Sequence, residues 1–215
     1  KVASDLRIRF STSHPKDMTD DVIHTMNKYD NICNYIHLPV QSGSSKILKK
    51  MNRGYTQQWY LERIKSIRKI IPDCAISTDI ITGFCDETEE DFNNTLDLMN
   101  KVKFDFAYMF FYSERPKTLA ERKYEDNVPE EIKRSRLQKV IDLQRKHSLR
   151  SNKACIGKVM EVLIEGVSKK SDLDFSGRNS ENCKVVFPKE NAIIGTFVNV
   201  LIEKCTPATL IGKIV

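Results

Sequence analysis

The first 128 residues alternate between short apolar, β-rich runs and segments with helical periodicity. The predicted strands cover residues 6–11, 35–40, 75–83 and 104–112. The predicted helices between them cover residues 19–29, 57–71 and 88–102. This alternation is typical of βα units built around a parallel sheet or barrel. We therefore predict the α/β fold class for this part of the chain.

The helix predicted at 57–71 shows where such helices should lie. Leu61, Ile64, Ile67 and Ile71 return at three- or four-residue spacing and share one face, while the basic residues fall largely on the other. A helix with one apolar stripe packs that stripe on a core. It should therefore cover the outside of the sheet.

The pattern changes in the last third of the chain. Pro129 and the two glutamates after it predict the start of a helix that closes the first domain. Beyond Gly157, β-branched runs are divided by Gly, Asn, Asp and Pro, which favours a small antiparallel β-barrel. These runs cover residues 158–165, 182–187, 196–204 and 209–215. We predict two domains, residues 1–152 and 153–215.

Charge and hydropathy narrow the class of protein further. Lys and Arg total 35 against 29 for Asp and Glu, and the net charge of +6 favours an acidic partner such as nucleic acid. No apolar run reaches the roughly 18 residues of a membrane span, and no signal peptide is evident. We expect a cytoplasmic protein with no membrane partner. Because the chain starts at Lys1 and soon enters an apolar run, we interpret it as a fragment of a longer protein.

The cysteines indicate no local metal site. They are widely separated, and none forms a CxxC or CxxxCxxC motif, the spacings typical of zinc and iron–sulfur ligands. They stand at positions 33, 74, 85, 155, 183 and 205. Isolated thiols of this kind are mostly small buried side chains. We therefore assign no metal ligand to the chain.

Polar residues follow the second predicted strand in the run HLPVQSGS at 37–44. Residues just past strand ends line the active-site face of a βα barrel, which makes Gln41 and Ser42 candidate ligand contacts. The same turn can be explained locally, because Ser44 or Ser45 could cap a short helix. The sequence leaves both interpretations open.

The next two strands add a carboxylate and a guanidinium group. Asp79 lies among apolar neighbours and needs a partner, either a ligand hydroxyl or amine or a structural arginine. Thr88 and Asp91 have the spacing of a capping box, which predicts a helix start after that strand. Arg115 follows the fourth predicted strand and suits a phosphate or carboxylate. No nucleophile, base and orienting group share a motif, so we assign no catalytic residue.

In the predicted barrel, a basic, amide-rich turn at 175–182 stands beside a strand that ends in an aromatic residue. Cations there could contact phosphates while an aromatic ring stacks on a base. The alternative is an ordinary turn beside a core phenylalanine. The residues that we predict to bind RNA are Lys158, Phe175, Arg178, Asn182, Lys184 and Phe187.

Five runs together resemble the radical S-adenosylmethionine methylthiotransferase family. They are HLPVQSGS at 37–44, MNRGYT at 51–56, TDIITGF at 78–84, YSERPKT at 112–118 and FSGRNSEN at 175–182. They occur in the family's order, and the first two are most similar to the branch that acts on N6-isopentenyladenosine in tRNA. The resemblance implies the C-terminal part of a radical SAM (β/α) barrel, followed by an OB-like TRAM domain that binds RNA. Two turns depart from the family's GFPGE and RPGT, reading GFCDE at 83–87 and RPKT at 115–118.

The resemblance also implies cofactors and partners. The full-length enzyme would use S-adenosylmethionine and two 4Fe–4S clusters, whose ligands are not in this chain, to install a methylthio group at C2 of the adenosine next to the anticodon of tRNA. Its missing N-terminal part would be the second partner, and the fragment alone would be inactive. The predicted cofactor-binding residues, which should meet at one rim of the sheet, are Gln41, Ser42, Arg53, Asp79 and Arg115.

Other functions fit the same residues. The substrate could be threonylcarbamoyl-adenosine in tRNA or a ribosomal protein, and the chain could instead be a non-catalytic RNA-binding module. A CxxxCxxC run upstream of Lys1 would favour the enzyme, and its absence from the gene would favour the binding module.

Overall fold

The computed structural model describes residues 6–12 and 14–215. The chain divides into two compact units. The sheet unit comprises Phe10–His24 and Ile36–Gln144, and the barrel unit comprises Lys1–Arg9, Thr25–Tyr35 and Arg145–Val215. The barrel unit therefore draws on segments near the start of the chain as well as on its end. The boundary between residues 152 and 153, drawn from sequence patterns, stays a prediction.

The sheet unit is built on a three-stranded sheet of order β1-β2-β3. Its strands are β1 (Tyr35–His37), β2 (Ala75–Thr82) and β3 (Phe106–Phe111), and β2 and β3 pair in parallel. The strand predicted at 6–11 does not form, since only Ile8 pairs there, in an isolated bridge to Ile32. A strand needs a ladder over several residues, and this run has no such partner.

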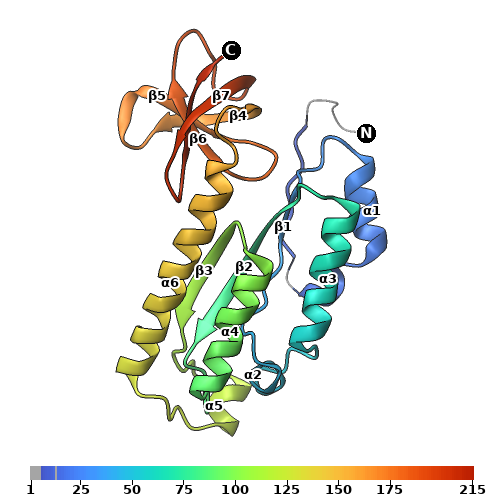
Figure 1. Ribbon diagram of the computed structural model, residues 1–215, viewed down its shortest axis with the longest axis vertical. Helices are drawn as coiled ribbons and strands as arrows, with labels where there is room; N and C mark the ends of the chain where they lie inside the picture. The colour runs from blue at the N-terminus through green and yellow to red at the C-terminus, as the bar shows by residue number, and fades with distance from the viewer. Residues whose placement is uncertain (1–5, 13) are drawn as a thin grey trace. The chain divides into compact units, whose positions relative to one another are not determined.

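Helices connect the strands, as the periodicity predicts (Figure 1). They are α1 (Asp20–Lys28), α2 (Ser45–Lys50), α3 (Gln57–Ile70), α4 (Glu89–Val102), α5 (Leu119–Lys123) and α6 (Glu130–Lys153), with a 3-10 turn at Pro15–Asp17. In α3, Tyr60, Ile64 and Ile67 are buried, so the predicted apolar stripe does pack on a core. Strand β2 is buried along its first four residues and alternates only from Thr78 to Thr82, with Ile76 and Ile80 fully buried.

The helix starts proposed from sequence are confirmed. The Ser44 hydroxyl accepts the Ile47 N–H and caps α2, while Thr88 and Asp91 form a capping box at α4. The Ser44 hydroxyl also donates to Asp91 Oδ1 over 2.7 Å, which ties the two helix starts together. Residues predicted from sequence as helix caps thus also make tertiary contacts.

The barrel unit contains a closed five-stranded barrel of order β4-β5-β6-β8-β7. The strands are β4 (Val159–Ser168), β5 (Ser171–Arg178), β6 (Lys184–Pro188), β7 (Phe197–Cys205) and β8 (Leu210–Ile214). The small barrel is confirmed, but β6 and β8 pair in parallel. Five strands cannot all alternate in direction around a closed ring, so at least one neighbouring pair must be parallel. The other four pairs are antiparallel.

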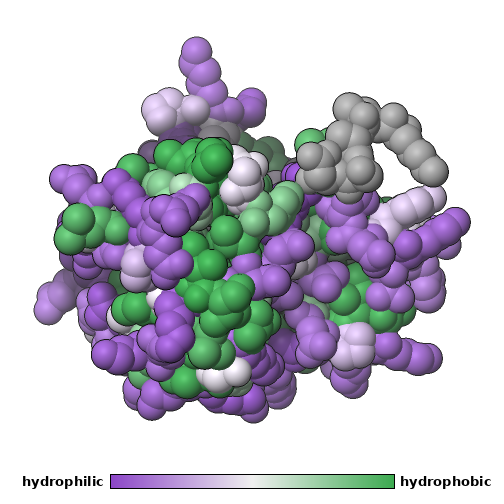
Figure 2. Space-filling model, turned by 90° about the horizontal axis from the view of Figure 1, so that it is seen from above, coloured by the Kyte–Doolittle hydropathy of each residue, from purple (hydrophilic) through white to green (hydrophobic). Residues whose placement is uncertain are grey.

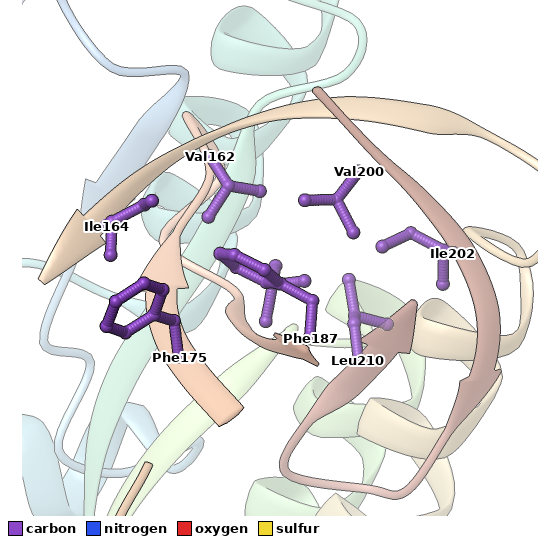
Figure 3. Close-up of a cluster of buried hydrophobic side chains, with 8 residues drawn as sticks. Val162, Ile164, Phe175, Phe187, Val200, Ile202 and Leu210 are labelled. Atoms are coloured by element: carbon purple, nitrogen blue, oxygen red, sulfur yellow. The ribbon is translucent and has the colours of Figure 1, made fainter. Parts of the chain in front are cut away.

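The barrel core is apolar on every strand (Figure 3). It consists of Val162, Ile164, Phe175, Val185, Phe187, Val200, Ile202 and Leu210. Strand β5 was missed from sequence because its serines, aspartates and glycine suggest a turn. Gly177 is needed in this strand, because a Cβ there would stand 2.1 Å from the Leu163 carbonyl oxygen. The glycine therefore allows β5 to approach β4 closely and does not mark a turn.

Candidate functional site

One face of the sheet carries a polar and aromatic cluster. Because β2 and β3 pair with Ser77 opposite Phe106, Asp79 opposite Tyr108 and Ile81 opposite Phe110, these six side chains share one face. The rings of Phe106, Tyr108 and Phe110 are about half exposed. We call this the open face. It combines stacking surface with hydrogen-bonding groups.

His37 of β1 organises the polar part of the open face. Its Nδ1 lies 2.8 Å from Ser77 Oγ, and its Nε2 lies 3.4 Å from Asp79 Oδ1. The ring also meets Tyr108 edge-on, with centroids 5.7 Å apart. The partner that the sequence required for Asp79 is therefore an imidazole rather than an arginine. The carboxylate stays about one quarter exposed, so it can still accept a hydrogen bond from a ligand hydroxyl or amine.

Gln41 stands beside Asp79 through the backbone. Its N–H donates to the Asp79 carbonyl over 2.9 Å, and its own carbonyl accepts the Ile81 N–H over 2.9 Å. Gln41 has a φ of 70°, in the left-handed region that costs a non-glycine residue free energy. Strain of this kind persists where the surrounding structure holds it and often accompanies function. The structure thus brings together two of the predicted cofactor-binding residues.

Ser42 points elsewhere, which corrects its assignment to the same rim. It is fully buried, its Oγ lies 3.4 Å from Thr95 Oγ1 on α4, and it accepts the Ser44 N–H. Gly43 follows it because a Cβ there would lie 2.3 Å from the Asn94 carbonyl oxygen. This turn fastens the end of β1 to α4, and Ser42 is not available to a ligand in this conformation.

The two predicted arginines have different partners. Arg53 donates through Nε to Tyr55 Oη over 3.2 Å, and its carbonyl oxygen lies 3.0 Å from His14 Nε2. It also approaches the Pro39 carbonyl at 3.5 Å, which places it near the end of β1. Arg115 is exposed in the loop after β3, where its carbonyl accepts the Thr118 N–H. The five predicted residues therefore do not form one contact cluster.

Sequence reasoning missed a buried ion pair between the loop after β2 and helix α6. Arg136 of α6 lies 3.0 Å from Glu87 Oε1, and that oxygen also accepts the Gly83 N–H over 2.7 Å. Burial raises the pKa of Glu87, against the opposing effects of Gly83 and Arg136. The pair holds the loop that follows β2. No sequence signal joins these residues, which lie far apart in the chain.

A polar pocket of about 400 Å³ opens after β3 and was also missed. Lys133 of α6 reaches both oxygens of Asp126, over 2.5 and 2.6 Å, and donates to the Tyr112 carbonyl over 3.3 Å. Burial, followed by the neighbouring Cys85, raises the pKa of Tyr112 to about 12. The pocket's one buried cation is thus already neutralised by an aspartate.

The described residues do not fit an iron–sulfur cluster. Among residues 6–12 and 14–215, no group of three His, Cys, Asp or Glu side chains converges as metal ligands would. All six cysteines are free thiols, and Cys33, Cys74 and Cys85 are buried. A cluster needs several thiolates close together. In the same part of the chain, no helix is both long enough and apolar enough to cross a membrane.

The barrel corrects part of the RNA assignment. Phe187 is 1% exposed and Phe175 is 8% exposed, so both rings belong to the core and offer no face to a base. Arg178 donates to the Asn182 carbonyl over 3.0 Å and lies 3.4 Å from Glu165 Oε2, which gives it structural partners. Asn182 has a φ of 63° and forms the turn between β5 and β6.

Two predicted cations remain accessible on the barrel. Lys158 is exposed and Lys184 is half-buried. The barrel also exposes apolar side chains, Leu173 and Ile193 most strongly. Figure 2, a view from above, shows green apolar patches among the purple hydrophilic residues. Exposed lysines suit phosphate contacts, and exposed apolar side chains suit contacts to bases.

The turn after β5 is held by the early part of the chain, within the barrel unit. Arg7 donates to the Arg178 carbonyl over 3.0 Å, pairs with Glu161, and lies 4.5 Å above the Phe197 ring. Arg9 donates to the Asn179 carbonyl over 3.1 Å. The arginines of the segment 6–11, which was predicted as a strand, thus bind the turn after β5 to the early part of the chain.

Comparison with known proteins agrees with this architecture. The family model "Radical SAM superfamily" matches residues 1–99, and the TRAM domain model matches residues 153–215. Coproporphyrinogen III oxidase from Escherichia coli, described as a radical SAM enzyme, superposes with a TM-score of 0.57 at 17% identity. The match covers 88% of this chain and 48% of that one, and it shows the fold alone. The chain thus combines a region similar to the radical SAM superfamily with one that matches the TRAM domain.

Closer relatives specify the branch. The chain is 60% identical over all 215 residues to a tRNA-2-methylthio-N(6)-dimethylallyladenosine synthase of Amoebophilus asiaticus. It is 61% identical over 208 residues, 97% of its length, to the protein of the same name from Christiangramia forsetii. The chain spans 44% and 43% of these two relatives, somewhat under half of their length. The resemblance to the methylthiotransferase family is confirmed.

Proposed function

We propose that the protein containing this chain is a tRNA methylthiotransferase that installs a methylthio group at C2 of N6-dimethylallyladenosine, also called N6-isopentenyladenosine, next to the anticodon. The observation that carries this proposal is the 60% identity to a synthase of that name over the whole chain. Identity at this level over both modules argues for a shared substrate and not only a shared fold. No observation on this structure favours a ribosomal protein or threonylcarbamoyl-adenosine as substrate.

The cofactors would be S-adenosylmethionine and two 4Fe–4S clusters. When bound, they supply the radical that activates C2 and the sulfur and methyl group that are added. The cluster ligands would come from the part of the relatives' length that this chain does not span. The described residues contribute binding and water exclusion rather than the redox chemistry itself.

The open face would take part in binding the nucleoside portions of cofactor and substrate. Asp79, held by His37, is suited to accept a hydrogen bond from a ribose hydroxyl or an ammonium group. Tyr108 and Phe110 offer half-exposed rings on which a planar base can stack. Gln41, next to Asp79, and the exposed Arg115 would add an amide and a cation. Arg53 would act by shaping the end of β1.

The barrel would hold the tRNA backbone. Lys158 and Lys184 can neutralise phosphates without reading sequence, as expected for a module that positions a folded RNA. The buried Phe175 and Phe187 would support this surface from the core instead of stacking on bases.

The proposal is tested with the full-length gene product. We would express it in a bacterial strain that lacks this modification, digest the tRNA, and measure methylthiolated and unmethylthiolated N6-dimethylallyladenosine by mass spectrometry. The expected result is conversion to the methylthiolated nucleoside. Methylthiolation of threonylcarbamoyl-adenosine or of a ribosomal protein instead would overturn the substrate, and RNA binding with no modification would support the binding module.

A substitution pair then addresses the open face. Asp79→Asn keeps the shape of the side chain and removes its charge, so conversion should fall by at least about tenfold if the carboxylate binds a ligand. Asp97→Asn, an exposed change on α4, is the matched control and should leave conversion unchanged. Equal activity of both variants would exclude Asp79 from the site.

A further inference from the structure

A groove of about 580 Å³ lies between α3 and α4 in the sheet unit. Its apolar lining includes Leu61 and Ile64 of α3 and Val102 of α4. Four cations also line it: Lys65, Arg68, Lys69 and Lys101. It lies on the helices and takes in none of the open-face residues. The site described above therefore does not account for it.

The cations of this groove form no ion pair with any of the described residues. Lys65, Lys69 and Lys101 take part in none of the ion pairs found in the described part of the chain. Arg68 donates to the Val102 carbonyl over 2.5 Å, which fixes its guanidinium group at the groove without neutralising it. Other cations of the sheet unit do pair, as Lys46 does with Asp91. No ion pair in the described part of the chain therefore neutralises these three lysines.

Helix ends explain only part of this charge. The C-terminus of a helix attracts cations, but the effect fades within the last turn. Arg68 and Lys69 lie in the last turn of α3, and Lys101 lies in that of α4. Lys65 stands a further turn back from the end of α3 at Ile70, and it repels Lys69 at four-residue spacing. A concave surface with surplus charge of one sign focuses the electrostatic potential on a partner of opposite charge.

We propose that this groove binds the phosphodiester backbone of the RNA substrate and is a second RNA-contacting surface besides the barrel. This inference rests on the proposed function for the identity of the partner. Lysines around a small apolar floor suit phosphates, whereas protein interfaces are depleted in lysine and rich in aromatic residues. The groove positions the RNA through its backbone and carries no base specificity.

The test measures binding of the full-length protein to fluorescently labelled tRNA at several salt concentrations. The triple variant Lys65→Gln, Lys69→Gln, Lys101→Gln should bind at least about tenfold more weakly, with a log–log salt slope shallower by about three, one for each lost phosphate contact. Replacing the same three lysines with arginine keeps the charge and should retain both values. A second control, Lys123→Gln, Lys139→Gln, Lys146→Gln, removes equal charge from exposed positions outside the groove.

The outcomes separate this inference from the proposed function. No tRNA binding by the wild-type protein would contradict the proposed function itself. The groove would not be an RNA-binding surface if the wild-type protein binds tRNA and the groove triple variant binds it with the same affinity. Equal losses of tRNA affinity in the groove triple and the control triple would lead to the same conclusion. Unchanged RNA affinity together with lost binding of poly-glutamate would assign the groove to an acidic protein partner and overturn RNA as its ligand.

Discussion

Arg136 Nη1 lies 3.0 Å from Glu87 Oε1, with both side chains at most 7% exposed. A buried ion pair contributes little net stability, but removing one partner leaves an uncompensated buried charge. Glu87→Ala leaves Arg136 only the exposed Glu89 carboxylate, 3.2 Å away, so it should lower the free energy of unfolding by about 3 kcal/mol, the low end for a broken buried pair, measured by urea denaturation. Glu130→Ala breaks the exposed pair with Arg134 and should cost under about 1 kcal/mol. Equal effects would mean that the Glu87 pair is solvated.

Asp91 should make the sheet unit sensitive to acid. Burial opposes its ionisation, but hydrogen bonds from Lys46, Ser44 and Thr88 outweigh burial and hold the pKa of Asp91 well below its usual range. Its folded pKa is thus lower than its unfolded pKa. The stabilisation is present above the unfolded pKa of about 3.9 and is lost as pH falls through the folded value. The stability difference between wild type and Asp91→Asn should shrink below about pH 4, as followed by urea titrations at a series of pH values. A constant difference would contradict this prediction.

Gly177 should be essential to barrel packing. A Cβ there would stand 2.1 Å from the Leu163 carbonyl oxygen and 2.7 Å from Val162 Cγ1, so Gly177→Ala must displace β4. We expect a loss of about 1–3 kcal/mol or more in the free energy of unfolding. Gly166→Ala is the matched control, because a Cβ on Gly166 meets no atom within 4 Å. Thermal melts followed by circular dichroism would compare them, and equal melting temperatures would show that β4 yields without cost.

Arg178 should stabilise the barrel, whereas Lys158 should contribute to RNA binding. Arg178→Ala removes the bond to Asn182 and the contact with Glu165, and should lower stability by about 1 kcal/mol with an unchanged salt slope of RNA binding. Lys158→Ala should leave stability unchanged and reduce that slope by about one. Filter binding at several salt concentrations, with melts of both variants, distinguishes the roles. If Arg178→Ala instead reduced the salt slope and left stability unchanged, Arg178 would be an RNA-binding residue.

The 215-residue chain should bind no iron–sulfur cluster after reconstitution with iron and sulfide, because its described cysteines do not converge. Absorption spectra and iron analysis would measure this, with the full-length gene product as the positive control. A stoichiometric 4Fe–4S absorption in the 215-residue chain would contradict the prediction.

Local signals in the sequence determined much of the fold. The α3 periodicity, the capping residues Ser44 and Thr88, and the β-branched runs after Gly157 each act over a few residues, so they are legible without a structure. The same holds for the motifs that resemble the family, since their order lies along the chain. These features predicted the βα region, the small barrel and the methylthiotransferase resemblance.

Only the tertiary structure decided which side chains meet, because that depends on which residues share a face and which are buried. His37 reaches Asp79 through strand pairing, whereas Ser42, one residue after Gln41, turns towards α4. Phe187 carries the same ring whether it stacks on a base or fills a core, and only the closed barrel decides between them. The Glu87–Arg136 pair joins distant residues through packing alone. No local pattern encodes that contact, since its stabilisation arises from burial and not from sequence spacing.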